Sequence, residues 1–169
     1  MKKVLRFIDS ISDSVAWLLK FLCYALVLIV CYDVTMRYVF NAPTEWAFET
    51  AMMLGCTVYA LAWSYTQRQN AHMRVDVIYA HLSPRGKAMI DVLGTLLIFF
   101  PLILVLIDVS LQYAVRAWKT GELSILTTWY PPIAPLRTVV VLGFGLFGLQ
   151  TTAKFIRDLY LLVKGGPHD

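Results

Sequence analysis

The chain has 169 residues, of which 59% are hydrophobic and 15% are charged. Soluble domains carry a charge on about a quarter of their residues, so this composition excludes an ordinary soluble domain and indicates a membrane protein. The formal net charge of +4 fits basic residues lying beside anionic membrane lipid, and it requires no nucleic-acid partner.

The first fourteen residues predict an amphipathic helix that lies along the cytoplasmic membrane surface. Its apolar residues recur at helical spacing and are Val4, Leu5, Ile8, Ile11 and Val15. The charged residues of the opposite side are Lys2, Lys3, Arg6, Asp9 and Asp13. No small-x-small cleavage site follows the apolar run 21–32, so we expect a retained membrane span here rather than a cleaved signal peptide.

Four apolar stretches of the chain are each long enough to cross a bilayer, which takes about 20 residues in a helix. The predicted spans cover residues 15–36, 46–66, 88–112 and 136–157. Charged residues lie mainly toward the ends of these stretches, where headgroups are within reach; they are Lys20, Asp33, Asp91 and Asp108. We therefore predict a single all-α membrane domain over residues 1–169 with four transmembrane helices.

The distribution of Lys and Arg predicts the orientation, because basic residues are retained on the cytoplasmic side during insertion. Most of them fall on the side that also holds both ends of the chain. The opposite side holds Arg37, Arg116, Lys119 and Arg137. Both termini are thus predicted to be cytoplasmic, in a bacterial inner membrane.

The first connection joins the spans 15–36 and 46–66. Asn-Ala-Pro at 41–43 ends the first helix, and Thr44 is a candidate cap for the next one. Glu45 and Glu49 then lie one turn apart on one helix face, where like charges repel. Two interpretations remain open: a cationic partner, either Arg37 or a residue of another subunit, or a solvated acidic face at the positive end of the helix dipole.

The central connection covers residues 67–87 and is expected on the cytoplasmic side. Its stretch 73–82 mixes apolar and charged residues and predicts a short helix along the membrane surface. Arg74 and Asp76 are expected to face water, lipid or a partner. Ser83 followed by Pro84 is typical of the start of the next helix.

The connection 113–135 is long and rich in aromatic and proline residues. Together with the first connection it supplies the predicted interface anchors, which are Trp46, Trp118, Trp129 and Tyr130. We expect Leu123 to Leu126 either to fold back over the helix ends or to contact another subunit. The charges expected on this side for docking or for structure are Arg37, Glu45, Glu49, Arg116 and Lys119.

Small residues suggest helix contacts rather than a nucleotide site. Gly143, Gly145 and Gly148 match G-x-G-x-x-G, but that fingerprint needs a strand and a soluble βαβ unit, and here it lies in an apolar span. Close helix packing is the favoured interpretation, with Ala51 and Gly55 as a similar pair on the second span.

Cysteine and histidine residues give no support for redox or metal chemistry. The cysteines, Cys23, Cys31 and Cys56, form no C-x-x-C pair and are expected to be apolar packing residues. The histidines, His72, His81 and His168, lie outside the predicted spans, so none can ligate an intramembrane haem. A His72–Asp76 metal site stays open beside the simpler interpretation of solvated loop residues. We predict no catalytic residue, metal or cofactor in this chain.

The whole chain resembles the DctQ-like small membrane subunit of tripartite ATP-independent periplasmic (TRAP) transporters. The resemblance rests on four spans with cytoplasmic ends, the segment Arg37-Tyr-Val-Phe, Glu45 with Glu49, Arg74-Val-Asp76, and a loop containing Trp and Pro before the fourth span. It implies two partners, a large DctM-like membrane subunit and a periplasmic substrate-binding protein. It also implies organic-acid uptake driven by sodium ions that bind in the large subunit, with this chain as a non-catalytic scaffold that helps dock the binding protein.

Two other functions are alternatives to a transporter subunit. A membrane anchor for a redox enzyme would need His or Cys ligands at span depth. A small oligomeric channel would need polar residues aligned on one helix face, whereas Thr57, Ser64, Thr95 and Gln150 are scattered.

Overall fold

The computed structural model describes residues 2–69 and 84–164. Its helices are α1 (Lys2–Tyr38), α2 (Glu45–Arg68), α4 (Pro84–Gly94), the π-helix η1 (Thr95–Phe99), α5 (Phe100–Thr120) and α6 (Ala134–Lys164). The described residues contain no strand, and an isolated β-bridge joins Leu123 to Pro132. The all-α prediction is therefore confirmed.

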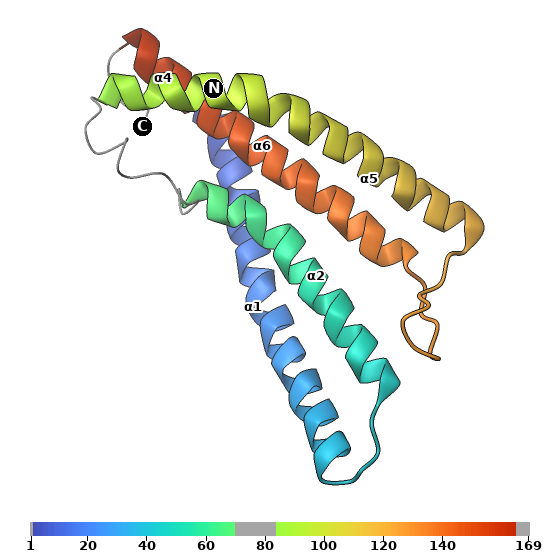
Figure 1. Cartoon of the computed structure of the whole chain (residues 1–169). Helices are drawn as coiled ribbons and strands as arrows, with labels where there is room; N and C mark the ends of the chain where they lie inside the picture. Colours follow the sequence, from blue (N-terminus) through green and yellow to red (C-terminus); the bar gives the residue numbers. More distant parts are fainter. Residues whose placement is uncertain (1, 70–83, 165–169) are drawn as a thin grey trace.

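The helices α4, η1 and α5 follow one another without a break and form one long rod (Figure 1). In η1 the amide of Phe100 donates to the carbonyl of Thr95, five residues earlier. Pro101 comes next and has no amide hydrogen to offer. Pro101 therefore cannot donate the backbone hydrogen bond that continues a regular α-helix, and the wider π-turn lies just before this gap.

Three helices of the described chain are long and apolar enough to cross a membrane: Phe7–Tyr38, Met89–Thr120 and Ala134–Tyr160. They correspond to three of the four predicted spans and extend beyond the predicted ends, except at the start of Met89–Thr120, which lies one residue after the predicted start at 88. The fourth, α2, is not among them, although it is a continuous helix of 24 residues.

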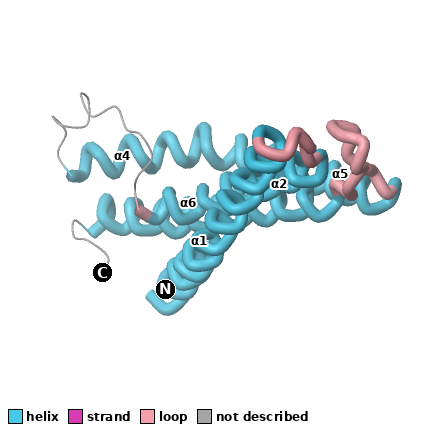
Figure 2. Tube along the Cα trace, turned by 90° about the horizontal axis from the view of Figure 1, so that it is seen from below, coloured by secondary structure: helices cyan, strands magenta, loops and turns pink. Residues whose placement is uncertain are grey.

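The helices pack in the order α1, α2, α6, α5. α2 lies between α1 and α6, and α6 also contacts α4, α5 and the first part of α1. The α1–α2 pair and the α5–α6 pair diverge toward their connecting loops (Figure 1), and from below α1 runs obliquely to α6 (Figure 2). We call the two ends of this arrangement the terminal end, where α1 begins and α6 ends, and the hairpin end, which holds the connections 39–44 and 121–133.

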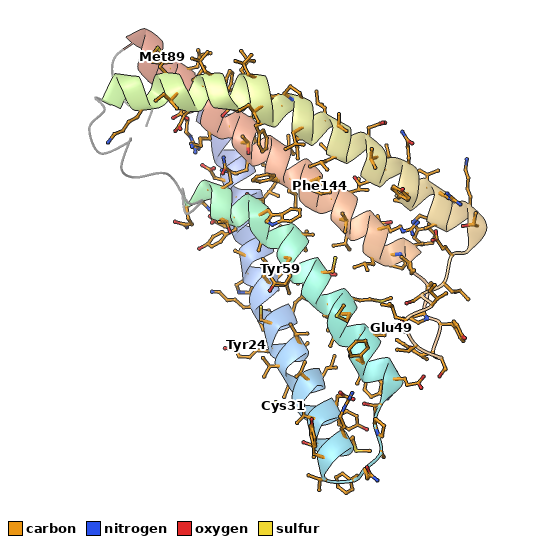
Figure 3. All side chains as sticks on the ribbon, viewed as in Figure 1. Tyr24, Cys31, Glu49, Tyr59, Met89 and Phe144 are labelled. Carbon is orange, nitrogen blue, oxygen red and sulfur yellow. The ribbon has the colours of Figure 1, made fainter. Side chains whose placement is uncertain are left out.

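The interior of the described chain is built mainly from small side chains. Six of the eight buried hydrophobic residues are alanines, namely Ala47, Ala60, Ala114, Ala117, Ala134 and Ala153. Long apolar side chains lie mostly on the outside, as Tyr24 does on α1 (Figure 3). Close contacts between small residues are typical of helices packed in lipid, where burying a Leu against a helix gains little over burying it in acyl chains.

Residues 2–14 are not a separate interfacial helix but the first turns of α1, which runs uninterrupted into the apolar span. The predicted polar face does not all turn to water. Asp9 and the nearly buried Ser12 face α2 and α6, because Arg68, Gln150 and Arg157 supply hydrogen-bonding partners there. The predicted helix over 73–82 lies outside the described residues.

Candidate functional site

Asp9 lies at the centre of a polar network at the terminal end. Gln150 Nε2 donates to Asp9 Oδ1 at 3.0 Å, and Arg157 Nη2 donates to Asp9 Oδ2 at 2.5 Å. Arg68 Nη1 donates to the Asp9 carbonyl oxygen at 3.1 Å. Ser12 Oγ donates to Gln150 Oε1 at 3.0 Å. We call these five residues the terminal network, and they tie α1, α2 and α6 together.

The terminal network has a structural role. Ser12 and Gln150 are 2% and 1% exposed, and hydrogen bonds at such positions avoid the desolvation cost of unpaired polar groups. Beside the network, Lys154 of α6 pairs with Asp91 of α4 at 3.3 Å. Sequence reasoning placed Asp91 at a membrane interface but did not foresee this partner, because no local spacing relates the two residues.

At the hairpin end, Glu45 and Glu49 hold the connection 121–133 against α2. Thr127 Oγ1 donates to Glu49 Oε2 at 2.7 Å. The amide of Thr128 donates to Glu45 Oε2 at 3.0 Å, and the Thr128 hydroxyl contacts the same oxygen. Figure 3 shows Glu49 on the side of α2 that faces this connection. We call these four residues the Glu–Thr clamp.

The two carboxylates of the clamp differ in environment. Glu45 is exposed, whereas Glu49 is 1% exposed and its Oε1 has no hydrogen-bond partner. A solvated acidic face therefore describes Glu45 but not Glu49. Within the described chain neither residue forms an ion pair, and Arg37 does not approach them as a partner.

Arg37 instead closes the first connection together with Asp33. Its Nη2 donates to Asp33 Oδ2 at 2.9 Å. Asp33 Oδ1 accepts from the hydroxyl of Thr44 at 2.7 Å and from its amide at 3.3 Å. Thr44 is the N-cap residue of α2 by position, but its side chain makes no cap hydrogen bond. The hydroxyl instead donates to the Asp33 carboxylate of α1 in a charge-assisted hydrogen bond.

A second ion pair fixes the start of α6. Arg137 donates to both oxygens of Glu122, at 2.6 and 2.8 Å, and to the carbonyl of Tyr113 at 3.1 Å. Such a bidentate pair is directional as well as strong. Sequence reasoning used Arg137 for orientation but missed this pairing. Gly121 ends α5 with a φ of 61°, a conformation that favours glycine. Its position in the sequence could have marked the end of the helix, but no local signal relates Glu122 to Arg137.

The residues 122–133 form a short hairpin between α5 and α6, which we call the 122–133 hairpin. Leu123 bridges Pro132, and the amide of Ser124 donates to the carbonyl of Pro131 at 2.8 Å. The amide of Ile133 donates to the Glu122 carbonyl at 3.1 Å. The hairpin does reach back to α2 through the Glu–Thr clamp, but Leu123 to Leu126 do not cover helix ends with their apolar side chains, because Ile125 and Leu126 are exposed.

The remaining outer charges and anchors lie at the surface. Arg116 and Lys119 are exposed on α5 and form no ion pair within the described chain. The predicted anchors, Trp46, Trp118, Trp129 and Tyr130, are all partly exposed and belong to elements of the hairpin end. The indole of Trp118 donates to the hydroxyl of Thr138 at 2.9 Å, which links α5 to α6.

The glycines of the predicted packing motif have different surroundings. A Cβ at Gly143 would lie 2.6 Å from the carbonyl oxygen of Ala60, so α2 and α6 touch through their backbones here. At Gly148 a Cβ would be 3.5 Å from Ile103, an ordinary contact. At Gly55 and Gly145 nothing lies within 4 Å, so these two glycines serve no close contact within the described chain. Ala51 is half-buried.

The described residues offer no site for metal binding or redox chemistry. They contain no group of three or more His, Cys, Asp and Glu residues placed to hold a metal ion. The three cysteines are exposed and free, so they are not packing residues in the interior of the described chain. Arg74, Asp76 and all three histidines lie outside the described residues.

A family model described as "Tripartite ATP-independent periplasmic transporters, DctQ component" matches residues 26–160. The chain belongs to this family. The resemblance drawn from the sequence is therefore confirmed, and it makes the chain an integral membrane subunit of a transporter rather than an enzyme. Family members work with a large TRAP membrane subunit and a substrate-binding protein as a tripartite system. A comparison with curated proteins gives no match.

The matched range contains the Glu–Thr clamp and the 122–133 hairpin. It does not contain Asp9 and Ser12, the two α1 residues of the terminal network. The family match therefore covers the hairpin end of this DctQ chain and only part of its terminal end.

Proposed function

We propose that this DctQ chain is a non-catalytic scaffold for the large membrane subunit of a sodium-coupled organic-acid transporter. The observation that carries the proposal is the exposure of its apolar helices. In the most apolar windows of the three long helices, 6%, 11% and 22% of the residues are buried within the chain. A surface of this kind needs lipid or another membrane protein beside it.

Polar groups within the helices support a scaffold rather than a solute path. Several hydroxyls of the spans donate to carbonyls one turn earlier, as Thr57 does to Met53 at 2.8 Å and Thr152 to Gly148 at 2.8 Å, whereas the buried Thr151 hydroxyl has no partner within the described chain. The bonded hydroxyls are already satisfied by their own helix. A path for a carboxylate or a sodium ion needs unsatisfied polar groups or broken backbone at membrane depth, which we assign to the large subunit.

The proposal includes α2 as the fourth span and both termini in the cytoplasm of the bacterial cell. α2 has 24 residues, which gives a length of about 36 Å for a hydrocarbon core of about 30 Å. It lies between α1 and α6 and packs against both, so it shares their surroundings. In the inner membrane this orientation directs the hairpin end to the periplasm.

We also propose that charges of the hairpin end help dock the substrate-binding protein. Arg116, Lys119 and Glu45 are exposed there, and exposed charges steer encounter and set register between partners. In this proposal Arg37 and Glu49 are structural, because Arg37 is hydrogen-bonded to Asp33 and Glu49 to Thr127. They hold the connections that carry the docking surface.

Co-purification and reconstitution test the function. The affinity-tagged chain should bring down a large multi-span subunit from the native membrane. Proteoliposomes should take up the organic acid only when both membrane subunits, the binding protein and a sodium gradient are present. Transport by this chain alone, a bound haem or quinone, or an assembly made solely of copies of this chain would contradict the proposal.

A further inference from the structure

The 122–133 hairpin is fixed firmly at its base. The Leu123–Pro132 bridge and the two backbone hydrogen bonds beside it close the hairpin. The Glu–Thr clamp attaches its middle to α2, and the ion pair between Glu122 and Arg137 attaches its start to α6. Three separate attachments hold one short segment, so its side chains are presented in a set arrangement.

The tip of this hairpin is apolar and exposed. Ile125 is 86% exposed and Leu126 is 65% exposed, while Trp129 and Tyr130 are about half exposed, at 49% and 52%. Leu123, at the base, is also 50% exposed. Two aromatic side chains, the type enriched in binding hot spots, are exposed here next to aliphatic ones. Because the attachments already hold the backbone, burying this cluster against a partner costs little additional conformational entropy.

We infer that the tip of the 122–133 hairpin is the apolar anchor of a docking surface for a water-soluble partner protein, inserting Ile125, Leu126 and Trp129 into an apolar recess of that partner. The inference deepens the proposed function and rests on it, because that function identifies the partner as the substrate-binding protein. It reassigns the main contact from the charged residues to apolar ones.

The backbone of the tip argues for a protein partner over the membrane core. Residues 125–131 are irregular, and backbone of this kind does not enter hydrocarbon, because its amides and carbonyls would lose their water. Within a protein interface the same groups can be satisfied by the partner or by trapped water.

The charge of Glu45, beside the middle of the hairpin, agrees with a protein partner. Glu45 is exposed beside Thr128 and has no ion pair within the described chain. Facing a partner it can pair with a Lys or Arg at the edge of the apolar recess, as rim charges of interfaces do.

The test uses the complex of both membrane subunits in nanodiscs and the purified binding protein. Leu126→Asp should weaken binding of that protein about tenfold or more and should lower uptake in proteoliposomes at limiting binding protein. Its matched control is Val39→Asp, which adds the same charge at an exposed apolar residue, 72% accessible, of the other connection at this end. Equal loss from both variants, or no loss from Leu126→Asp, overturns the inference.

A photo-crosslinking residue at position 125 identifies the occupant directly. Adducts with the binding protein that disappear in the Leu126→Asp background support the inference. Adducts solely with lipid, with the large subunit or with a second copy of this chain overturn it. Co-purification with the large subunit is scored separately, so failure of the scaffold proposal is distinguished from failure of the hairpin inference.

Discussion

Glu49 combines two properties that rarely coincide, because it is an acidic residue with 1% exposure and one of its oxygens has no partner. The other oxygen accepts from Thr127. We expect Glu49→Ala to lower the free energy of unfolding by about 1–3 kcal/mol, because the part-buried hydrogen bond from Thr127 is lost. Glu49→Gln keeps an acceptor for Thr127 and removes the charge, so it should be close to neutral.

Thermal unfolding of the two Glu49 variants in detergent measures this difference. Proteolysis between α5 and α6 adds a local readout, since Glu49→Ala should expose the 122–133 hairpin to cleavage before the helices unfold. If Glu49→Gln destabilises as strongly as Glu49→Ala, the charge itself is needed, and a cationic partner outside the described residues would have to be sought.

Asp9 gives a second prediction at the scale of one residue. Its carboxylate accepts from Gln150 and Arg157 and is partly buried, with a side-chain exposure of 18%. Asp9→Ala should destabilise by about 1.5–3 kcal/mol, the usual range for hydrogen bonds to charged groups. Asp13→Ala is the control: Asp13 also pairs with Arg68 of the network, but it is 53% exposed, and exposed pairs contribute about 0–1 kcal/mol. Equal unfolding temperatures for the two variants would refute a structural role of the terminal network.

The contacts of these residues were beyond sequence reasoning, although the residues themselves were singled out. Asp9 meets Arg157 across a separation of 148 residues, and Glu49 meets Thr127 across 78. Periodicity relates residues one or two turns apart, and it correctly placed Glu45 and Glu49 on one helix face. It carries no information about which distant segment folds against that face. The spacing argument therefore predicted the need for a partner and proposed Arg37, whereas the structure supplies threonine hydroxyls.

At the scale of the helix, Gly143 is where α2 and α6 approach most closely among the described glycines. A methyl group at this position would meet the Ala60 carbonyl oxygen at 2.6 Å, and backbone cannot swing aside as a side chain can. Gly143→Ala should therefore cost about 1–3 kcal/mol through overpacking. Gly145→Ala, with nothing within 4 Å, should leave stability unchanged or raise it slightly.

Unfolding temperatures of the purified variants, together with a cysteine cross-link between α2 and α6, measure the effect of Gly143. The cross-link should slow in Gly143→Ala and not in Gly145→Ala. Equal behaviour of the two would mean that the helix pair is free to separate, contrary to the packing described.

Helices were the part of the fold that the sequence predicted best, because long apolar runs leave few alternatives. The predicted ends were less accurate. α1 begins at Lys2 and α6 ends at Lys164, beyond the predicted spans 15–36 and 136–157. The amphipathic pattern did predict a helix over residues 1–14, but not that it is continuous with the first span, because periodicity does not distinguish one long helix from two helices that meet.

For the whole molecule, the exposed apolar helices predict strong dependence on the partner subunit. A partner that binds the folded chain stabilises it by about 2.7 kcal/mol at a concentration of a hundred times the dissociation constant. For a chain of this size we expect the unfolding temperature to rise by about 5–10 °C on co-purification with the large subunit. Differential scanning fluorimetry of the chain alone and in the complex measures this rise in unfolding temperature. An unchanged temperature in a complex that stays intact would argue against a scaffold interface of this extent.

Membrane class and family were within reach of the sequence, because they depend on composition, topology and the order of short segments. The divergence of the two helix pairs was not, since it results from where the small residues of α2 and α6 meet and from the attachments at the two ends. The surface helix expected over residues 73–82, with Arg74 and Asp76, stays a prediction.

The π-helix η1 decides which side of the rod faces α6. Asp91 and Ile103 both contact α6, through Lys154 and Gly148, yet twelve positions of regular α-helix would turn them about 120° apart. The extra residue of the π-turn cancels about 100° of that rotation, which leaves the two nearly in line. Deleting one residue within Thr95–Phe99 would leave eleven positions of regular α-helix between Asp91 and Ile103, a net rotation of about 20°. Both contacts to α6 should therefore survive while the π-turn disappears. The π-turn thereby absorbs one residue without a change of phase, and one straight helix offers a polar contact and an apolar seam to the same neighbour.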